Sequence, residues 1–147
     1  MRFLALSLVL LVGCAATPAR RGGSSDQLVN AYAGWTVNRA DGGPTIGATY
    51  EQPWKDDLGL GGFADVTFAD HTDVVVGPAV FYHPADRWTA FGGLGIEFEG
   101  GDSGLLARIG GSYEFPQKSY SISPMAFLDI GRSDVIAFLG VAFGWRF

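Results

Sequence analysis

The sequence predicts an all-β protein, an eight-stranded antiparallel up-and-down β-barrel that crosses a membrane. From residue 27 onward, no apolar residues recur at helical spacing. Apolar and small or polar residues instead alternate in short segments, which is typical of strands. The 147 residues also include 22 glycines and 14% aromatics. Glycine is costly inside helices and aromatic residues favour strands, so composition points to the same fold class.

The composition excludes several other classes of protein. An apolar content of 48% with only 17% charged residues argues against intrinsic disorder. The formal net charge of −5 argues against a nucleic-acid partner, which would need a basic patch. A single cysteine leaves no internal disulfide and no multi-cysteine zinc site. We therefore expect no metal and no cofactor.

The N-terminus has the pattern of an export signal. Phe3 to Val12 is an apolar run after Met1-Arg2, and it is too short for a membrane-spanning helix of about 20 residues. Leu11-Val-Gly-Cys14 resembles the lipobox of bacterial lipoproteins. This resemblance implies that residues 1–13 are a signal peptide and that Cys14 carries a lipid. Because Ala15 follows Cys14, the resemblance also favours the outer membrane.

An ordinary signal peptide with a chance cysteine near the cleavage site is the alternative, and it also leads to export. Residues 14–26 are small and polar without periodicity, and we expect them to form a flexible linker. Residues 27–147 are then the barrel domain.

Seven clusters of turn residues divide this domain into eight segments. They lie at 39–44, 52–57, 69–71, 84–86, 100–103, 116–118 and 131–133. Alternation is clear in the segments 58–68, 88–99, 105–115, 120–130 and 135–147, and weaker in the first two and in 73–83. Pro78 and Pro124 fall inside segments, and each should cause a bulge or a local break because it lacks an N–H.

The last segment shows which face is which. Its odd positions from Val135 to Phe147 are all apolar, whereas its even positions are mostly small and end with Arg146. Consecutive residues of a strand point to opposite faces. A soluble barrel would carry many charges on its outer face, but only two lysines follow residue 13. A second face of glycines, phenylalanines and single charges fits the lumen of a narrow membrane barrel.

Aromatic residues sort by height along the predicted barrel. If the N-terminus lies in the periplasm, the outward positions at the periplasmic ends of the strands are aromatic: Tyr50, Tyr82, Trp88, Tyr113, Phe115, Tyr120, Trp145 and Phe147. Trp35, Phe68 and Phe98 fall at the opposite ends. Aromatic girdles of this kind mark the interfaces of a bilayer.

The end of the chain carries a family signature. Val141-Ala-Phe-Gly-Trp-Arg-Phe147 resembles the C-terminal signature of bacterial outer-membrane barrels, with Phe143, Trp145 and Phe147 on one face. The stretch from about residue 27 to 147 is similar in plan to the small OmpA-like and OmpX-like barrels. This resemblance implies insertion by the barrel assembly machinery, contact with outer-membrane lipids and a monomeric state.

Five charged residues fall on the predicted inward face: Asp65, Glu97, Arg108, Glu114 and Asp129. An unpaired charge in a narrow lumen is costly, so Arg108 should bond one or more of the carboxylates. This charge network can be a gate for protons or ions, or a structural filling of a lumen too narrow for a pore. We favour the structural filling.

No catalytic residues are assigned. Gly101-Asp-Ser-Gly104 matches the short motif around the serine of chymotrypsin-like proteases, but it is better explained as a hairpin turn. The sequence thus favours a non-enzymatic outer-membrane barrel with a structural or envelope role, a plugged polar lumen and no open channel. The alternatives are a periplasmic lipoprotein whose soluble β-barrel binds a small apolar ligand, and a lipid-modifying enzyme in which His83 would be needed.

Overall fold

The structure, a computed structural model, describes residues 27–37, 42–132 and 134–147. These residues form nine β-strands: β1 (Leu28–Val37), β2 (Gly42–Lys55), β3 (Leu58–Phe68), β4 (Thr72–Ala85), β5 (Trp88–Glu99), β6 (Asp102–Tyr113), β7 (Phe115–Pro116), β8 (Ser121–Ile130) and β9 (Val135–Arg146). No helix in these ranges is long and apolar enough to cross a membrane. The predicted signal peptide at 1–13, Cys14 and the linker at 14–26 lie outside the described residues.

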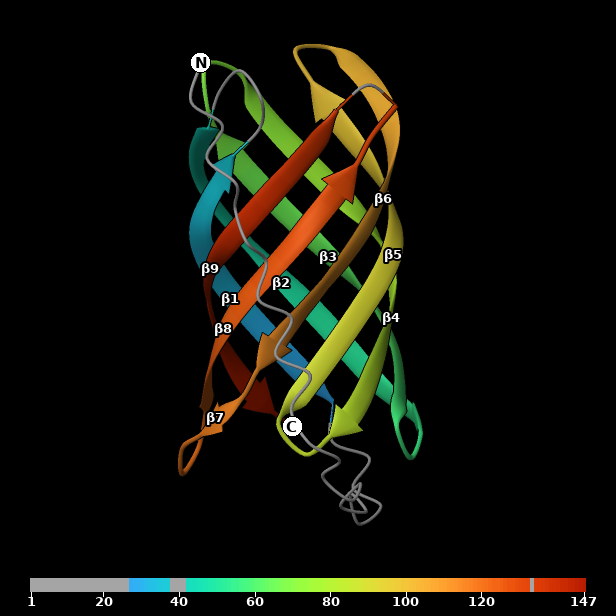
Figure 1. The fold of residues 1–147 in the computed structure, drawn as a ribbon, viewed down its shortest axis with the longest axis vertical. Helices are drawn as coiled ribbons and strands as arrows, with labels where there is room; N and C mark the ends of the chain where they lie inside the picture. Colours follow the sequence, from blue (N-terminus) through green and yellow to red (C-terminus); the bar gives the residue numbers. More distant parts are fainter. Residues whose placement is uncertain (1–26, 38–41, 133) are drawn as a thin grey trace, which may run out of the picture.

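The strands close into a single antiparallel barrel (Figure 1). Successive strands pair with each other, and β1 pairs with both β2 and β9, so that the sheet closes on itself. The short β7 continues β6, because both pair with β8 in the same register. Nine strand segments therefore make eight barrel strands, which confirms the predicted fold class.

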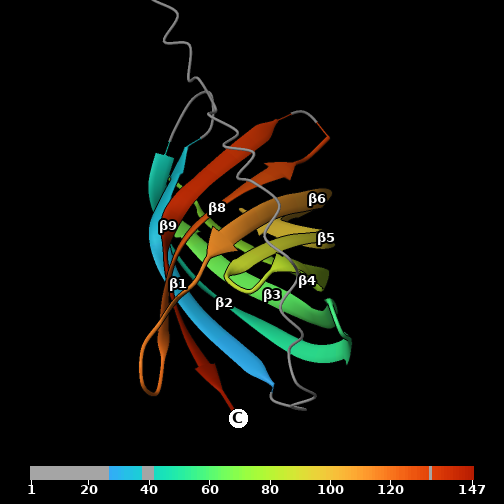
Figure 2. The same cartoon turned by 60° about the horizontal axis from the view of Figure 1, so that its bottom comes forward.

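The two ends of the barrel are distinguished by where its first strand begins and its last strand ends. Gln27 and Phe147 exchange two backbone hydrogen bonds of 3.0 Å. We call this end the proximal end, and Figure 2 shows it turned forward. The turns after β2, β4 and β7 lie there too, whereas those after β3, β5 and β8 lie at the other, distal end. The distal turns after β3 and β5 are only three and two residues long.

The prolines have partly the effect expected from the sequence. β6 and β7 are interrupted at Glu114, opposite the part of β8 that holds Pro124, although the register resumes unchanged. The β4–β5 ladder similarly lacks a pair at Pro78 without losing its register. The two register shifts lie instead beside other prolines, between Pro53 and Lys55 in β2 and between Tyr82 and Ala85 in β4. Bulges therefore occur at the proximal turns, where ending a ladder disrupts fewer hydrogen bonds.

The outward faces form an uninterrupted apolar belt. In the middle of the described strands every outward residue is apolar or glycine, including Leu94, Leu105 and Leu139, which are 68%, 77% and 70% exposed. A water-soluble monomer rarely exposes so large an apolar surface.

The aromatic residues lie at the two levels that the sequence predicts. At the proximal end, Tyr50, Tyr82, Trp88, Phe115, Tyr120, Trp145 and Phe147 are exposed on the outer face. Tyr113 is half-buried there, edge-on to both Trp88 and Phe115 at 5.0 Å. Trp35, Phe68 and Phe98 are exposed towards the distal end. The belt between the two levels is therefore suited to the hydrocarbon of a bilayer.

Inward-facing side chains fill the lumen, and glycines make room for them. The buried apolar set includes Tyr32, Phe63, Phe127 and Phe138. A Cβ on Gly110 of β6 would lie only 2.5 Å from the Cβ of Phe127. Glycine is thus required at this position because the Phe127 side chain occupies the space that a methyl group would need.

Candidate functional site in the lumen

The middle of the lumen is occupied by the guanidinium of Arg108. The side chain comes from β6 and is only 1% exposed. Its Nε and Nη2 donate to the two oxygens of Asp129 on β8, over 2.7 and 2.6 Å. Its Nη1 and Nη2 donate to Asp65 on β3. Arg108 therefore binds two carboxylates in a forked geometry from opposite sides, as a planar guanidinium allows.

A tyrosine completes this arrangement. Tyr32 of β1 donates its hydroxyl proton to Asp65 Oδ2 over 2.7 Å, and its oxygen accepts from Arg108 Nη1 at 3.3 Å. Asp65 and Asp129 are 5% and 4% exposed. All oxygens of both carboxylates are hydrogen-bonded, which offsets much of the cost of burying the charges. We call Tyr32, Asp65, Arg108 and Asp129 the Arg108 cluster.

Aromatic rings cover the guanidinium. The Arg108 Cζ lies 4.2 Å from the ring centroid of Phe63 and 3.9 Å from that of Phe127. Both distances are within the range of cation–π attraction. Phe127 is itself stacked on Phe138, with centroids 4.4 Å apart. Polar and aromatic side chains together thus fill the cross-section of the barrel at this level.

A small cavity lies on either side of the Arg108 cluster. The distal cavity has about 30 Å³ and is lined by Asp65, Asp73, Glu97 and Asp129, among others. The proximal cavity has about 20 Å³, with Thr49, Glu51, Thr89 and Ser123 in its lining. Each has room for one or two waters, since a water needs roughly 10–15 Å³ by this measure. Both cavities are therefore too small for a solute much larger than water.

The structure divides the five charged residues that the sequence groups in the lumen. Asp65, Arg108 and Asp129 are in direct contact. Glu97 on β5 lines the distal cavity. Glu114 lies at the proximal end, where both of its oxygens accept from Arg146 Nη2 at 2.7 Å. Arg108 thus binds the two aspartates at its own level, while Glu97 and Glu114 lie nearer the two ends.

A second buried polar group was not identified from the sequence. His83 of β4 lies with Nε2 2.6 Å from Oε1 of Glu51 on β2, and with Nδ1 3.1 Å from Oγ1 of Thr89 on β5. A carboxylate can only accept, so Nε2 carries the proton. In the neutral imidazole, Nδ1 then accepts the hydroxyl proton of Thr89. The result is a chain of hydroxyl, imidazole and carboxylate at the proximal side of the lumen.

The sequence did not predict that Glu51 lies in the lumen, and the reason is its position beside a predicted turn. The sequence places a turn at 52–57, which leaves Glu51 at the end of a weakly alternating segment. In the structure β2 continues to Lys55, so Thr45, Thr49 and Glu51 all face inward. The sequence did contain a signal for an inward Glu51, because Thr45, Thr49 and Glu51 are polar and lie at alternate positions, so they share one face of the strand. Elsewhere, no group of three or more His, Cys, Asp or Glu among the described residues could hold a metal ion.

The comparisons with known proteins agree with this architecture. The chain matches no protein-family model and no curated protein sequence. It is similar to the crystal structure of the N-terminal β-barrel domain of OprF from Pseudomonas aeruginosa, with a TM-score of 0.63 and 15% identity. That match covers 84% of this chain and 99% of the OprF domain.

Two further structures show the same arrangement. The outer membrane protein Ail of Yersinia pestis, in a phospholipid nanodisc, has a TM-score of 0.58 at 12% identity, over 84% of this chain and 100% of Ail. A transmembrane β-barrel designed de novo has a TM-score of 0.56 at 14% identity, over 85% of this chain and 98% of the design. At such low identities the likeness concerns the fold, and the fold of this chain is that of the eight-stranded transmembrane β-barrels of the bacterial outer membrane.

Proposed function

We propose that the protein is a non-enzymatic, monomeric barrel of the outer membrane with a structural role in the envelope and a closed lumen. The observation that carries this proposal is the Arg108 cluster. Its ion pairs join β3, β6 and β8 across the lumen, and the rings of Phe63 and Phe127 cover the guanidinium. Such a cluster stabilises the barrel and leaves no room for a solute to pass.

The outer surface and the turns support the same role. The apolar belt between two aromatic levels is suited to lipid contact. The short distal turns after β3 and β5 present little surface for binding another cell or a large ligand. We orient the barrel so that its proximal end, where Gln27 and Phe147 lie, faces the periplasm. The barrel assembly machinery is the partner expected to read Phe143, Trp145 and Phe147 during insertion.

Gel mobility tests the membrane barrel directly. Barrels of this kind are expected to keep their structure in SDS until heated, so the unheated protein should migrate differently from the boiled one. The alternative, a soluble periplasmic lipoprotein with an apolar ligand, predicts that both samples migrate alike. Identical mobility would overturn the proposal.

Conductance in planar lipid bilayers tests the closed lumen. We expect no stepwise conductance after the purified barrel is inserted, because the Arg108 cluster fills the cross-section. Insertion is verified in the same sample by the heat-dependent change in mobility. Stable ion-conducting steps from the inserted barrel would favour the gate interpretation of the charged lumen over the structural one.

The buried Glu51–His83–Thr89 chain favours a second candidate, a hydrolase with Thr89 as nucleophile. In serine hydrolases the hydroxyl is the nucleophile, the imidazole takes its proton, and the carboxylate orients the imidazole. The adjoining proximal cavity of about 20 Å³ is too small for an acyl chain, which places this candidate second. Hydrolysis of a lipid ester that is abolished in both His83→Ala and Thr89→Val would favour the enzyme.

A further inference from the structure

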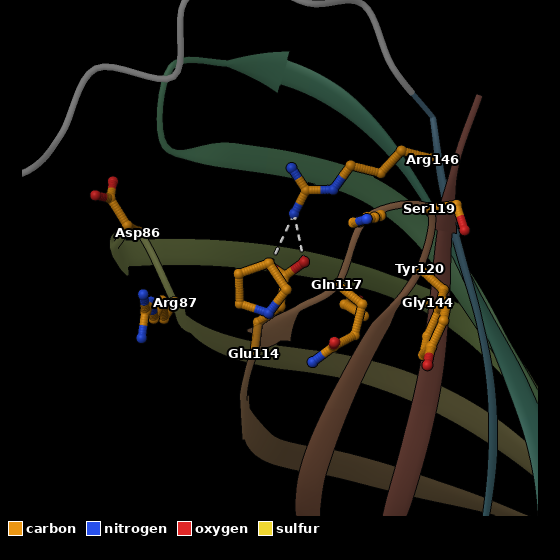
Figure 3. Close-up of a pocket in the computed structure, with 11 residues that line it drawn as sticks. Asp86, Arg87, Glu114, Gln117, Ser119, Tyr120, Gly144 and Arg146 are labelled. Atoms are coloured by element: carbon orange, nitrogen blue, oxygen red, sulfur yellow. Dashed lines mark hydrogen bonds and ion pairs between the residues drawn. The ribbon is translucent and has the colours of Figure 1, made fainter.

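A cavity lies at the mouth of the proximal end. It has a volume of about 450 Å³, which is within the range of small-molecule sites. Its walls come from the turn between β4 and β5, the turn between β7 and β8, and the end of β9. Figure 3 shows the residues that line it. We call it the mouth pocket.

Basic side chains are concentrated in the mouth pocket. Arg87, Lys118 and Arg146 line it, each from a different one of the three wall segments. The other basic residues in the described part of the chain are Lys55, Arg108 and Arg132. Half of these six therefore meet in one pocket of a chain whose net charge is −5. Such a local excess of positive charge attracts anions in an otherwise acidic protein.

The acidic residues of the pocket do not cancel this excess. Glu114 binds Arg146 through both oxygens, so these two charges neutralise each other. Both bonds come from Arg146 Nη2, and a guanidinium has further N–H donors. Arg87 and Lys118 then face one further carboxylate, Asp86. No ion pair of Arg87 or Lys118 is formed with any residue in the described ranges.

The neutral groups of the mouth pocket are also hydrogen-bond donors. The hydroxyls of Ser119 and Ser121 and the side-chain amide of Gln117 line it. Arginine binds phosphate through paired N–H groups, and lysine binds it as a point charge. Basic side chains from three segments, accompanied by such donors, are suited to a group with several acceptor oxygens.

We infer that the mouth pocket is a binding site for a phosphate group that is presented from the proximal, periplasmic side. Arg87 and Lys118 supply the charge, and Arg146, held in place by Glu114, supplies additional donors. The phosphate can belong to a free anion or to a lipid headgroup at the membrane surface. This site goes beyond the proposed structural role and does not depend on whether the lumen conducts ions.

The test uses the full chain in detergent micelles and follows backbone amide shifts by two-dimensional NMR. Sodium phosphate is titrated at constant ionic strength against sodium chloride. We expect saturable shifts at Arg87, Lys118 and Ser119 in the millimolar range, with no such response at Asp56 and Asp57 of the neighbouring turn. The absence of any phosphate-specific shift in the mouth pocket, in micelles and nanodiscs alike, would overturn the inference.

Variants distinguish phosphate binding in the mouth pocket from general attraction of phosphate to basic residues at the proximal end. The double variant Arg87→Gln/Lys118→Gln should weaken phosphate binding by about tenfold or more, a loss of roughly 1.4 kcal/mol. Lys55→Gln removes a basic residue from the same end but outside the pocket, and it should keep the affinity within about twofold. Equal affinities of the double variant and the wild type would contradict the inference. Unchanged heat-dependent mobility shows that the variants are folded.

Nanodiscs then distinguish the two sources of phosphate. Both lipids carry a headgroup phosphate, but choline neutralises it in phosphatidylcholine, whereas phosphatidylglycerol keeps a net negative charge. If the headgroup is the ligand, phosphatidylglycerol nanodiscs should therefore shift the pocket amides relative to phosphatidylcholine nanodiscs, and the double variant should lose this difference. If a free anion is the ligand, sodium phosphate should shift them in phosphatidylcholine nanodiscs. Either result supports the mouth pocket as a phosphate site.

Discussion

At the scale of the residue, Arg108 joins three other strands across the lumen through its side chain. It is almost completely buried and is bonded to Asp65, Asp129 and Tyr32. Removing one partner of a buried ion pair leaves the other charges without compensation, and this is more costly than never having the pair. In this lumen the two aspartates would then face each other in a narrow space.

Arg108→Ala should therefore lower the free energy of unfolding by about 3–5 kcal/mol. Urea unfolding in detergent micelles, followed by tryptophan fluorescence, measures the change. Arg146→Ala is the matched control, because its pair with Glu114 lies at the rim and the arginine side chain is 42% exposed. That control should cost about 1 kcal/mol or less. Equal effects of the two substitutions would show that the Arg108 cluster does not stabilise the barrel.

A second prediction at this scale concerns glycine in β6. Gly110→Ala should lower the free energy of unfolding by about 1–3 kcal/mol, since the new methyl group meets Phe127 and the backbone of β8. Gly104 lies on the same strand, and a Cβ there would meet nothing within 4 Å. Gly104→Ala should thus change the stability by about 0.5 kcal/mol at most. The same urea titration measures both variants, and a neutral Gly110→Ala would mean that the lumen is less tightly filled than described.

At the scale of the element, the strands follow from alternation, and their interruptions follow from proline. β9 alternates most regularly in the sequence and forms one continuous strand from Val135 to Arg146. Phe143 and Trp145 of this strand, and Phe147 directly after it, are exposed, and they are the residues of the predicted C-terminal signature. Exposed residues contribute little to the packing of the lumen. A substitution at one of them can therefore test a role in assembly without a large change in the free energy of unfolding.

Phe147→Ser should reduce the amount of assembled barrel in the outer membrane severalfold, because the assembly machinery is expected to read this signature. The refolded protein in detergent should lose only about 1 kcal/mol or less, as for an interfacial position. Val135→Ser alters the other end of the same strand and should leave assembly unchanged. The heat-dependent form is quantified on gels of isolated membranes. Normal assembly of Phe147→Ser would contradict a signal at this residue.

At the scale of the whole molecule, closure of the sheet determines what the protein can do. Pairing of β1 with β9 removes both free edges, so every strand has two neighbours and the backbone can lie in hydrocarbon. Closure also turns one face of every strand into a narrow lumen. Strands rather than a lipid on Cys14 should then hold the protein in the membrane.

Cys14→Ala tests this expectation. A barrel embedded through its apolar belt should stay in the membrane fraction after a carbonate wash, whether or not the lipid is attached. Immunoblots of the pellet and the supernatant measure the distribution, and a known peripheral membrane protein serves as the wash control. Release of Cys14→Ala into the supernatant would mean that the lipid is the anchor and that the belt does not span the membrane.

The sequence by itself determined the number of barrel strands, the inward and outward faces and the two aromatic levels, because these depend on local alternation and turn residues. Only the tertiary structure decided which inward charges meet. Asp65, Arg108 and Asp129 lie on β3, β6 and β8, and their contact depends on the tilt and register of the closed barrel. The same is true of Glu51 and His83, and of the basic residues in the mouth pocket. Local alternation determines which face of a strand a residue lies on. Contacts across the lumen depend on the tilt and register of all the strands in the closed barrel.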